Sequence, residues 1–216
     1  MSGPVVAART EGEVARQIAR AAARLFAERG YDATSVREIV EAAGVTKPTL
    51  YYHFGSKEGL AQALLTVPMT AFSARLKACL DATPEPVANL AAQLEAHFEF
   101  IREDPDRGRF YYALKFGPHR SSLAEELMKF GHELSETMQE GFDRVVASGA
   151  VDGARAERFA TAVWGMILTH MMEFLYPKPE CRSAVAAEYG PGHARAMLSD
   201  LLEGFAPRAR QKESNR

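Results

Sequence analysis

Apolar residues recur at intervals of three and four positions along almost the whole chain. This spacing gathers apolar side chains on one face of an α-helix, whereas a half-buried strand needs a period of two. Runs of alternating apolar and polar residues bounded by hairpin turns are nearly absent. The pattern therefore predicts an all-α protein of about nine helices.

The starts and ends of the first four helices are marked by residues that suit helix caps. The first two expected caps are each followed by a glutamate three residues later, which is the capping-box spacing. Glycines after the first two helices suit a left-handed helix end. Pro68 interrupts the fourth pattern, so we expect a break or kink there. The residues expected at the four helix starts are Thr10, Ser35, Thr46 and Ser56.

Longer helical patterns follow a turn that is marked by Pro84 and Pro86. An interruption at Asp104-Pro105 precedes a short aromatic helix, and a long helix with an acidic outer face comes next. The helix from about Ala154 to Tyr176 is apolar nearly all the way round, so it must be covered on several sides. A last helix is expected at residues 192–206.

The composition is that of a soluble globular protein, with 47% hydrophobic and 25% charged residues. The most apolar run, Phe159 to Tyr176, is at the lower limit for a membrane span. Because it contains His170 and Glu173, we interpret it as a buried helix and expect no membrane partner. Residues Met1 to Arg9 show no signal-peptide pattern, so the expected location is the cytoplasm.

The charge distribution gives only weak support to a nucleic-acid partner. The first 65 residues contain eight Lys/Arg and seven Asp/Glu, and the remainder contains eighteen and twenty-one, for a net charge of −2. A near-neutral chain does not attract phosphates strongly as a whole. Any DNA-binding function must therefore rest on a specific motif.

Residues 34–57 contain two short helical patterns joined by a glycine turn, the layout of a helix-turn-helix. The second pattern concentrates hydroxyl groups, a lysine, two tyrosines and a histidine, which suit bonds to phosphates and base edges. Lys47 and Thr49 occupy the start of the recognition helix, and Arg37 has the fork that reads guanine. The residues expected to contact DNA are Ser35, Arg37, Thr46, Lys47, Pro48, Thr49, Tyr51, Tyr52, His53 and Lys57.

Residues 10–65 resemble the DNA-binding domain of the TetR/AcrR family of bacterial transcription regulators. The segments that carry the resemblance are Ala27-Glu28-Arg29-Gly30-Tyr31, Thr34-Ser35-Val36-Arg37-Glu38-Ile39, Ala42-Ala43-Gly44-Val45, Thr46-Lys47-Pro48-Thr49-Leu50-Tyr51-Tyr52-His53-Phe54, Ser56-Lys57-Glu58 and Leu60. The expected organisation is a flexible arm at 1–9, a helix-turn-helix DNA-binding domain at 10–65, a helical-bundle ligand-binding and dimerisation domain at 66–206 and a disordered tail at 207–216.

The resemblance also implies a homodimer that binds a palindromic operator in double-stranded DNA. Such proteins usually dimerise through their last two long helices, which are 154–176 and 192–206 here. Both helices have more apolar surface than one core needs. The residues expected at this interface are Phe159, Met166, Met197, Leu198, Leu201, Leu202 and Phe205.

The resemblance further implies a cavity for a small-molecule effector inside the helical bundle. Aromatic and methionine side chains suit an adaptable apolar site, although each of these positions could equally belong to a plain core. The residues expected to line the cavity are Phe98, Phe116, Leu134, Met138, Trp164, Ile167, His170 and Met171. Ligand binding would release the regulator from DNA, as for a repressor, while an activator of the same family remains open.

Two alternatives use the helical domain differently. An enzyme could employ His170 and Glu173 as an acid–base pair, but no nucleophile elbow or phosphate loop supports it. A protein that acts through a protein partner would not need the polar set at 46–57. We expect no catalytic residues, no cofactor and no metal site, since the histidines are scattered. Cys79 and Cys181 are interpreted as reduced thiols, with a redox role as the alternative.

Overall fold

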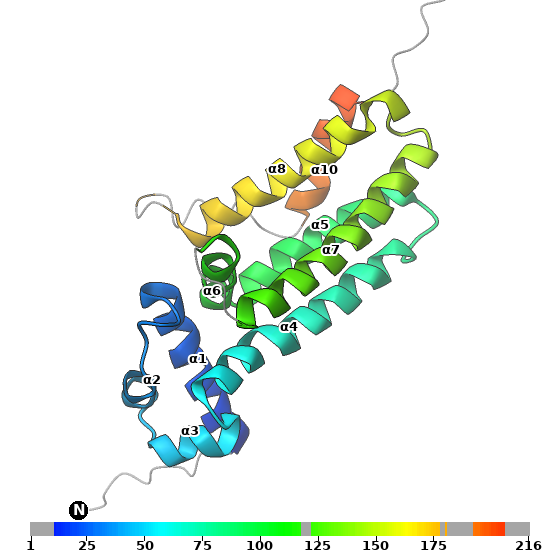
Figure 1. Ribbon diagram of the computed structural model, residues 1–216. Coiled ribbons are helices and arrows are strands. Elements are labelled where there is room, and N and C mark those ends of the chain that lie inside the picture. The colour runs from blue at the N-terminus through cyan, green and yellow to red at the C-terminus, as the bar shows by residue number, and fades with distance from the viewer. Residues whose placement is uncertain (1–10, 118–121, 178–179, 181–191, 206–216) are drawn as a thin grey trace, which may run out of the picture. The chain divides into compact units, whose positions relative to one another are not determined.

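The computed structural model describes residues 11–117, 122–177, 180 and 192–205, and every regular element in these ranges is a helix (Figure 1). The all-α class is therefore confirmed. The elements are α1 (Glu11–Arg29), α2 (Val36–Ala43), α3 (Lys47–Phe54), α4 (Lys57–Leu80), α5 (Pro86–Glu103), α6 (Pro105–Phe116), α7 (Ser122–Ala147), the 3-10 helix η1 (Gly153–Arg155), α8 (Ala156–Leu175) and α10 (His193–Phe205).

The chain forms two compact units that do not follow the boundary expected at residue 65. Unit 1 comprises Met1–Thr70 and Asp104–Lys129, and unit 2 comprises Ala71–Glu103 and Phe130–Arg216. Helix α6 belongs to unit 1 because it packs against α1. The assignment of DNA binding to the first 65 residues, and of ligand binding and dimerisation to the rest, stays a prediction.

The core of unit 1 forms where α1, α2, α3 and α6 each contribute an apolar face. Ile18 and Phe26 of α1 are fully buried, as are Ile39 of α2 and Leu50 of α3. The ring of Phe26 packs on that of Phe110 in α6, with centroids 4.9 Å apart. Because the eight-residue helix α3 has Leu50 as its buried residue, most of its other positions face away from this core.

Three of the four expected caps are present, while Thr10 lies outside the described residues. Ser35 begins the capping box of α2, in which its Oγ accepts the N–H of Glu38 at 3.3 Å. Gly44, with φ 59°, ends α2 in the left-handed conformation. Thr46 caps α3 by accepting the N–H of Thr49 at 3.4 Å. These caps define a three-residue turn between the two helices.

The elbow between α3 and α4 depends on a glycine. Ser56 caps α4 by accepting the N–H of Gly59 at 2.9 Å. A Cβ placed on Gly59 would overlap the carbonyl oxygen of Phe54, the last residue of α3. Glycine therefore lets the first turn of α4 approach the end of α3 closely.

Helix α4 continues through Pro68, so the expected break is absent. Proline has no N–H for the helical ladder, yet Lys57–Leu80 forms one helix. Buried Leu64, Leu65 and Met69 anchor it on both sides of the proline. In length and composition α4 is also the one helix in the described ranges that could cross a membrane. Its buried leucines explain this apolar character equally well, as a core helix would.

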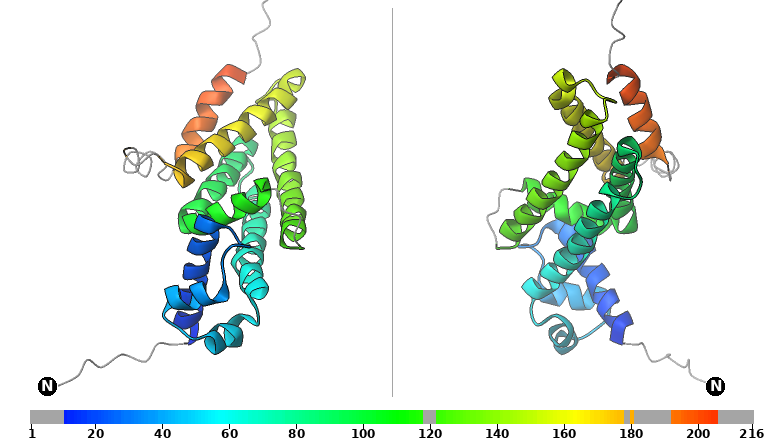
Figure 2. Two further views of the ribbon diagram at one scale, coloured as in Figure 1. Left: turned by 60° about the vertical axis from the view of Figure 1, so that its left-hand side comes forward. Right: turned by 90° about the vertical axis from the view of Figure 1, so that its right-hand side faces the viewer.

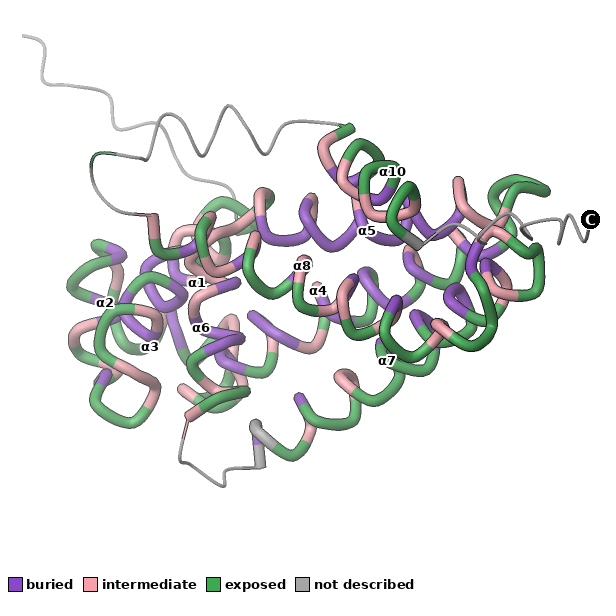
Figure 3. Tube along the Cα trace, turned by 90° about the horizontal axis from the view of Figure 1, so that it is seen from above, coloured by how far each residue is buried: buried purple, intermediate pink, exposed green. Residues whose placement is uncertain are grey.

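In unit 2, α5 is enclosed by its neighbours. Helices α8 and α10 pack against it (Figure 2), and buried residues occur on most of its turns (Figure 3). Buried Gln93 of α5 donates its side-chain amide to the carbonyls of Leu76 at 3.5 Å and Thr137 at 3.3 Å. A Cβ at Gly141 of α7 would overlap the amide oxygen of Gln93. A polar side chain thus joins α4, α5 and α7 inside the core.

Candidate nucleic-acid interface

The exposed face of α3 contains four of the residues that the sequence assigned to DNA contact. Lys47, Pro48, Tyr51 and Tyr52 are exposed, whereas Leu50 is fully buried. Residues four apart share a helix face, which pairs Lys47 with Tyr51 and Pro48 with Tyr52. Tyr51 is 47% and Tyr52 73% exposed, so packing within the unit does not account for either side chain.

Some polar groups on this face are already engaged, and others are available. The hydroxyls of Thr46 and Thr49 lie 2.8 Å apart and serve the cap of α3. The Tyr52 hydroxyl donates to the carboxylate of Glu11, at the start of α1, at 3.3 Å. Within the described ranges, the Lys47 ammonium and the Tyr51 hydroxyl have no hydrogen-bond partner. They can therefore bind a phosphate without first breaking an internal bond.

His53, near the end of α3, lies partly behind the exposed face. Its side chain is half-buried, and its ring centroid is 5.1 Å from that of Tyr52 and 6.2 Å from that of Phe54. The His53 ring thus packs edge-on against the ring of Tyr52. A hydrogen bond from His53 to a phosphate remains a prediction.

The two predicted contacts in α2 take part in local interactions. The Ser35 hydroxyl lies 2.8 Å from the Glu38 carboxylate inside the capping box. The Arg37 guanidinium pairs with Glu41 one turn later, at 2.7 Å between Nε and Oε1, and the bond to Glu41 raises the pKa of Arg37. Both members of this pair are exposed, and such pairs are weak. Arg37 can therefore exchange Glu41 for a base edge at little cost.

Lys57, which the sequence predicts to contact DNA, is directed into unit 1. Its ammonium donates to the carbonyls of Tyr31 at 2.8 Å and Thr34 at 2.9 Å, and it lies 4.2 Å from the centroid of the Tyr31 ring. Burial, with the charge of Glu58 next in size, raises the pKa of Tyr31. A phosphate would have to draw the ammonium away from two carbonyls and a ring.

The segment that contains α2, the glycine turn and α3 is similar in sequence to segments of known proteins. Residues 18–64 match the family model for bacterial regulatory proteins of the tetR family. This match places residues 18–64 in the tetR family. The KstR2 transcriptional repressor of Mycobacterium tuberculosis H37Rv is 41% identical over 80 residues, which are 37% of this chain and 40% of that protein. The FasR activator of Mycolicibacterium smegmatis is 36% identical over 96 residues, or 44% of each chain.

The chain thus matches less than half the length of these TetR-family relatives. A solved structure extends the likeness in fold. The crystal structure of AibR in complex with isovaleryl coenzyme A and operator DNA superposes with a TM-score of 0.63 at 21% identity. It covers 90% of this chain and 99% of that one. The helical arrangement of unit 2 is therefore included in the shared fold.

Seven of the eight residues predicted to line a ligand cavity lie on α5, α7 and α8 of unit 2. Phe98, Leu134, Met138, Ile167 and Met171 are buried there. His170 and Trp164 are half-buried, and the Phe98 ring is 5.9 Å from that of His170. Whether these residues line a cavity stays a prediction.

Phe116 does not join this group, which corrects its predicted place. It lies at the end of α6 in unit 1, is 62% exposed, and stacks on Tyr112 with ring centroids 5.7 Å apart. The sequence placed it on a short aromatic helix but did not show that this helix packs with α1. Its exposed ring belongs to the surface of unit 1.

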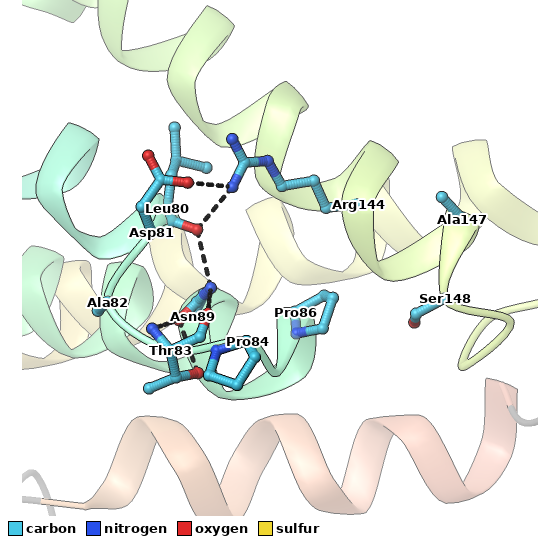
Figure 4. A pocket seen from close by; sticks show the side chains of 10 residues that line it. All are labelled: Leu80, Asp81, Ala82, Thr83, Pro84, Pro86, Asn89, Arg144, Ala147 and Ser148. Atoms are coloured by element: carbon cyan, nitrogen blue, oxygen red, sulfur yellow. Dashed lines mark hydrogen bonds and ion pairs between the residues drawn. The ribbon is translucent and has the colours of Figure 1, made fainter.

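A hollow of about 680 Å³ lies in unit 2 between the α4–α5 loop and the end of α7 (Figure 4). The guanidinium of Arg144 borders it and donates to the carbonyl of Leu80 at 2.7 Å. The same group pairs with Asp81 at 2.8 Å and Glu140 at 2.6 Å. None of the predicted cavity residues lines this hollow, and its charged groups are paired with one another.

The predicted dimer residues divide between core and surface. Phe159, with no exposed area, and Leu198, 1% exposed, belong to the core of unit 2, so they have almost no surface to offer a second subunit. Met166, Met197, Leu201 and Leu202 are half-buried. Nothing is described of the Phe205 side chain. The assignments of Phe159 and Leu198 to an interface are therefore replaced by core packing.

Helix α8 is also less enclosed than its composition suggested. Its buried residues form one stripe, Phe159, Val163, Ile167, Met171 and Leu175. Leu168, on another face, is 40% exposed. The sequence predicted cover on several sides, and within one chain this cover is incomplete.

Three residues that contact predicted DNA-binding residues were missed by sequence reasoning. Glu11 bonds to Tyr52, Glu41 pairs with Arg37, and Tyr31 receives Lys57. The spacing of Arg37 and Glu41, four residues apart in one helix, could have revealed their pairing. The other two contacts join helices that the sequence does not place next to one another.

Proposed function

We propose that the protein is a ligand-responsive transcriptional regulator that binds a palindromic operator as a homodimer. In this proposal it is a repressor that leaves DNA when a small apolar or aromatic molecule binds unit 2. The exposed face of α3 carries the proposal, because Lys47, Tyr51 and Tyr52 project from a helix of the recognition type without serving the core. The names of the KstR2 and FasR relatives, a repressor and an activator, support regulation in either direction.

DNA binding would place α3 in the major groove, with α2 crossing the backbone. Lys47 and Tyr51 would contact phosphates or base edges directly, and Arg37 would leave Glu41 to reach a base. The second subunit would place its own α3 roughly 34 Å away, one turn along the duplex. A site with two inverted half-sites follows from this symmetry.

The dimer would use the incompletely covered faces of α8 and α10. Met166 and Leu168 of α8 and Met197, Leu201 and Leu202 of α10 remain wholly or partly accessible. The rings of His170 and His193 lie 5.2 Å apart, which brings the two helices together within unit 2. An apolar surface shared by two adjacent helices is what a stable homodimer buries.

The effector would bind among α5, α7 and α8. Phe98, Met138 and Met171 supply an aromatic and methionine-rich environment of the kind that adapts to apolar ligands. AibR, which shares the fold, was solved in complex with isovaleryl coenzyme A and operator DNA, and this supports the binding of a small molecule as well as DNA. An effector that binds one conformation more tightly shifts the population toward it.

Selection of duplexes from a random-sequence pool, followed by fluorescence anisotropy on the selected site, tests DNA recognition. We expect enrichment of an inverted repeat and binding about 10³-fold tighter than to a scrambled duplex. Equal affinity for both duplexes would refute a sequence-specific regulator. Lys47→Met is expected to weaken binding to either duplex, because a phosphate contact does not depend on sequence.

A thermal-shift screen of apolar and aromatic metabolites tests the effector site. A ligand present at 100 times its Kd stabilises the folded state by about 2.7 kcal/mol. A hit should also lower the affinity for the selected duplex. A ligand that raises the unfolding midpoint but leaves DNA affinity unchanged would contradict the regulatory role. A cytoplasmic location is part of the proposal, since the DNA it would bind is there.

A further inference from the structure

A hydrogen bond joins the two ends of the helix-turn-helix segment, residues 34–57. The Lys57 ammonium, in the first residue of α4, donates to the carbonyl of Thr34, the residue before the cap of α2, at 2.9 Å. The segment between these two residues contains α2, the glycine turn and α3. The ends of the DNA-reading segment are therefore fastened to each other by a charged side chain.

The α1–α2 turn, which accepts the hydrogen bonds of Lys57, is also hydrogen-bonded to the end of α1. The single O–H of Thr34 is shared between the carbonyls of Gly30 at 2.8 Å and Leu25 at 3.3 Å, and Thr34 is 1% exposed. Lys57 adds a second bond, to the carbonyl of Tyr31, at 2.8 Å. Hydrogen bonds to a charged donor are about twice as strong as neutral ones. The start of α4 is thus tied to the end of α1 as well as to α2.

An aromatic series connects this turn to α6. The Lys57 ammonium lies 4.2 Å from the centroid of the Tyr31 ring. The Tyr31 ring is 5.3 Å from that of Phe26, which is 4.9 Å from that of Phe110. Phe26 and Phe110 are almost completely buried. Helix α6 therefore supports, from inside unit 1, the turn on which Lys57 closes.

We propose that Lys57 is a positioning residue for DNA binding, which closes the helix-turn-helix onto the α1–α2 turn, and that α6 supports this closure through Phe110, Phe26 and Tyr31. This inference rests on the proposed DNA-binding function. It assigns Lys57 a role that acts through the orientation of α3, without a phosphate bond of its own. Helix α6 then has a contact route to the DNA-reading segment that does not pass along α4.

A matched pair of lysines separates positioning from phosphate contact. Lys57→Met keeps the aliphatic stem and removes the ammonium, and Lys47→Met does the same at an exposed site with no described partner. The measurements are the unfolding midpoint and the Kd for the selected duplex over a range of salt concentrations. A phosphate contact contributes about 0.9 to the slope of log K against log salt.

For Lys57→Met we expect a midpoint several degrees lower, a Kd roughly 2- to 30-fold higher and an unchanged salt slope. For Lys47→Met we expect an unchanged midpoint and a slope that is shallower by about 0.9 for each subunit. A shallower slope with an unchanged midpoint for Lys57→Met would overturn the inference. An unchanged midpoint and an unchanged Kd would overturn it too.

A double-variant cycle tests the contribution of α6. Phe110→Leu retains an apolar side chain and removes the ring contact to Phe26. If α6 supports the closure, Phe110→Leu raises the Kd in the wild-type background and has a smaller effect when combined with Lys57→Met. Strictly additive effects on log Kd would remove α6 from the proposal. Should the wild-type protein bind no duplex specifically, the proposed function fails, while the midpoint of Lys57→Met still tests the closure.

Discussion

Helices α3 and α8 distribute their apolar residues in opposite ways. In α3, Leu50 is buried and two tyrosines are left in solvent, whereas α8 has a stripe of five buried residues and a further apolar face that one chain does not cover. The exposed aromatic residues of α3 stand out because the core does not use them. In α8 the residues that pack the core and those left uncovered have the same chemical character.

Phe159→Ala tests the core side of this comparison and should have the largest effect. Phe159 has no exposed area, and truncation of a buried phenylalanine costs about 3–5 kcal/mol. The unfolding midpoint, measured by circular dichroism, should fall by roughly 10 °C. Leu168→Ala is the matched control on the same helix; because Leu168 is 40% exposed in one chain, its loss should be well below that of Phe159→Ala. Similar losses for the two variants would contradict the division of α8 into core and surface.

Leu168→Glu tests whether the uncovered face of α8 serves a dimer. A carboxylate placed in an apolar interface is left without a partner, so the dimer dissociation constant should rise by tenfold or more, corresponding to about 1.4 kcal/mol. Light scattering during size-exclusion chromatography at several protein concentrations measures this change. Ser135→Glu, on the exposed face of α7, is the control. A dimer that is unaffected by Leu168→Glu would move the interface elsewhere.

Tyr51→Phe tests the exposed face of α3 at the scale of one hydroxyl group. Loss of a hydrogen bond to a charged phosphate costs about 1.5–3 kcal/mol, so the Kd for the selected duplex should rise by roughly 10- to 150-fold. The unfolding midpoint should not change, because the hydroxyl has no partner within the described ranges. Tyr176→Phe, also at an exposed tyrosine, should leave the Kd unchanged. A lower midpoint for Tyr51→Phe would show that the hydroxyl serves the fold instead.

Glu38→Gln should have the smallest effect and concerns the dependence of stability on pH. The backbone N–H of Ser35, followed by the Ser35 hydroxyl, lowers the pKa of Glu38. A carboxylate with a lowered folded pKa stabilises the protein above its unfolded pKa, about 4.3, and this contribution is lost as pH falls through the folded value. Glutamine still fits the capping box but does not titrate.

The difference in midpoint between wild type and Glu38→Gln should therefore be present at pH 7 and shrink toward pH 3. Thermal melts at a series of pH values measure it. A difference that grows in acid would mean that the sign of the pKa shift is wrong. The effect belongs to one exposed capping box and should leave α8 and its neighbours unaffected.

Features set by neighbouring residues could be predicted from the sequence, and features set by packing between distant segments could not. The caps at Ser35, Thr46 and Ser56 depend on bonds within three residues, so their spacing reveals them. The exposed positions of α3 were predictable because they too depend on spacing within one short helix. The contact of Phe110 with Phe26 joins α6 to α1 and depends on the tertiary fold, which is why Phe116 was placed in the wrong group.

The internal contacts of Lys57 could not be predicted for a similar reason. A lysine at the start of a helix beside a recognition helix has the charge and position for a phosphate contact. Its partners are two backbone carbonyls more than twenty residues earlier. Every residue has a backbone carbonyl, so the residue types in the sequence do not indicate these partners. The two faces of α8 were beyond sequence reasoning because leucine and methionine serve a core and an interface equally well.

The tight elbow at Gly59 limits how the DNA specificity proposed for this protein can be redesigned. A Cβ at residue 59 would overlap the carbonyl oxygen of Phe54, so even an alanine there would push α3 away from α4. A library intended to recognise a new operator should therefore vary the exposed positions 47, 48, 51 and 52 and leave the elbow unchanged. Variation at the elbow would move the whole of α3, and every proposed base contact would change together.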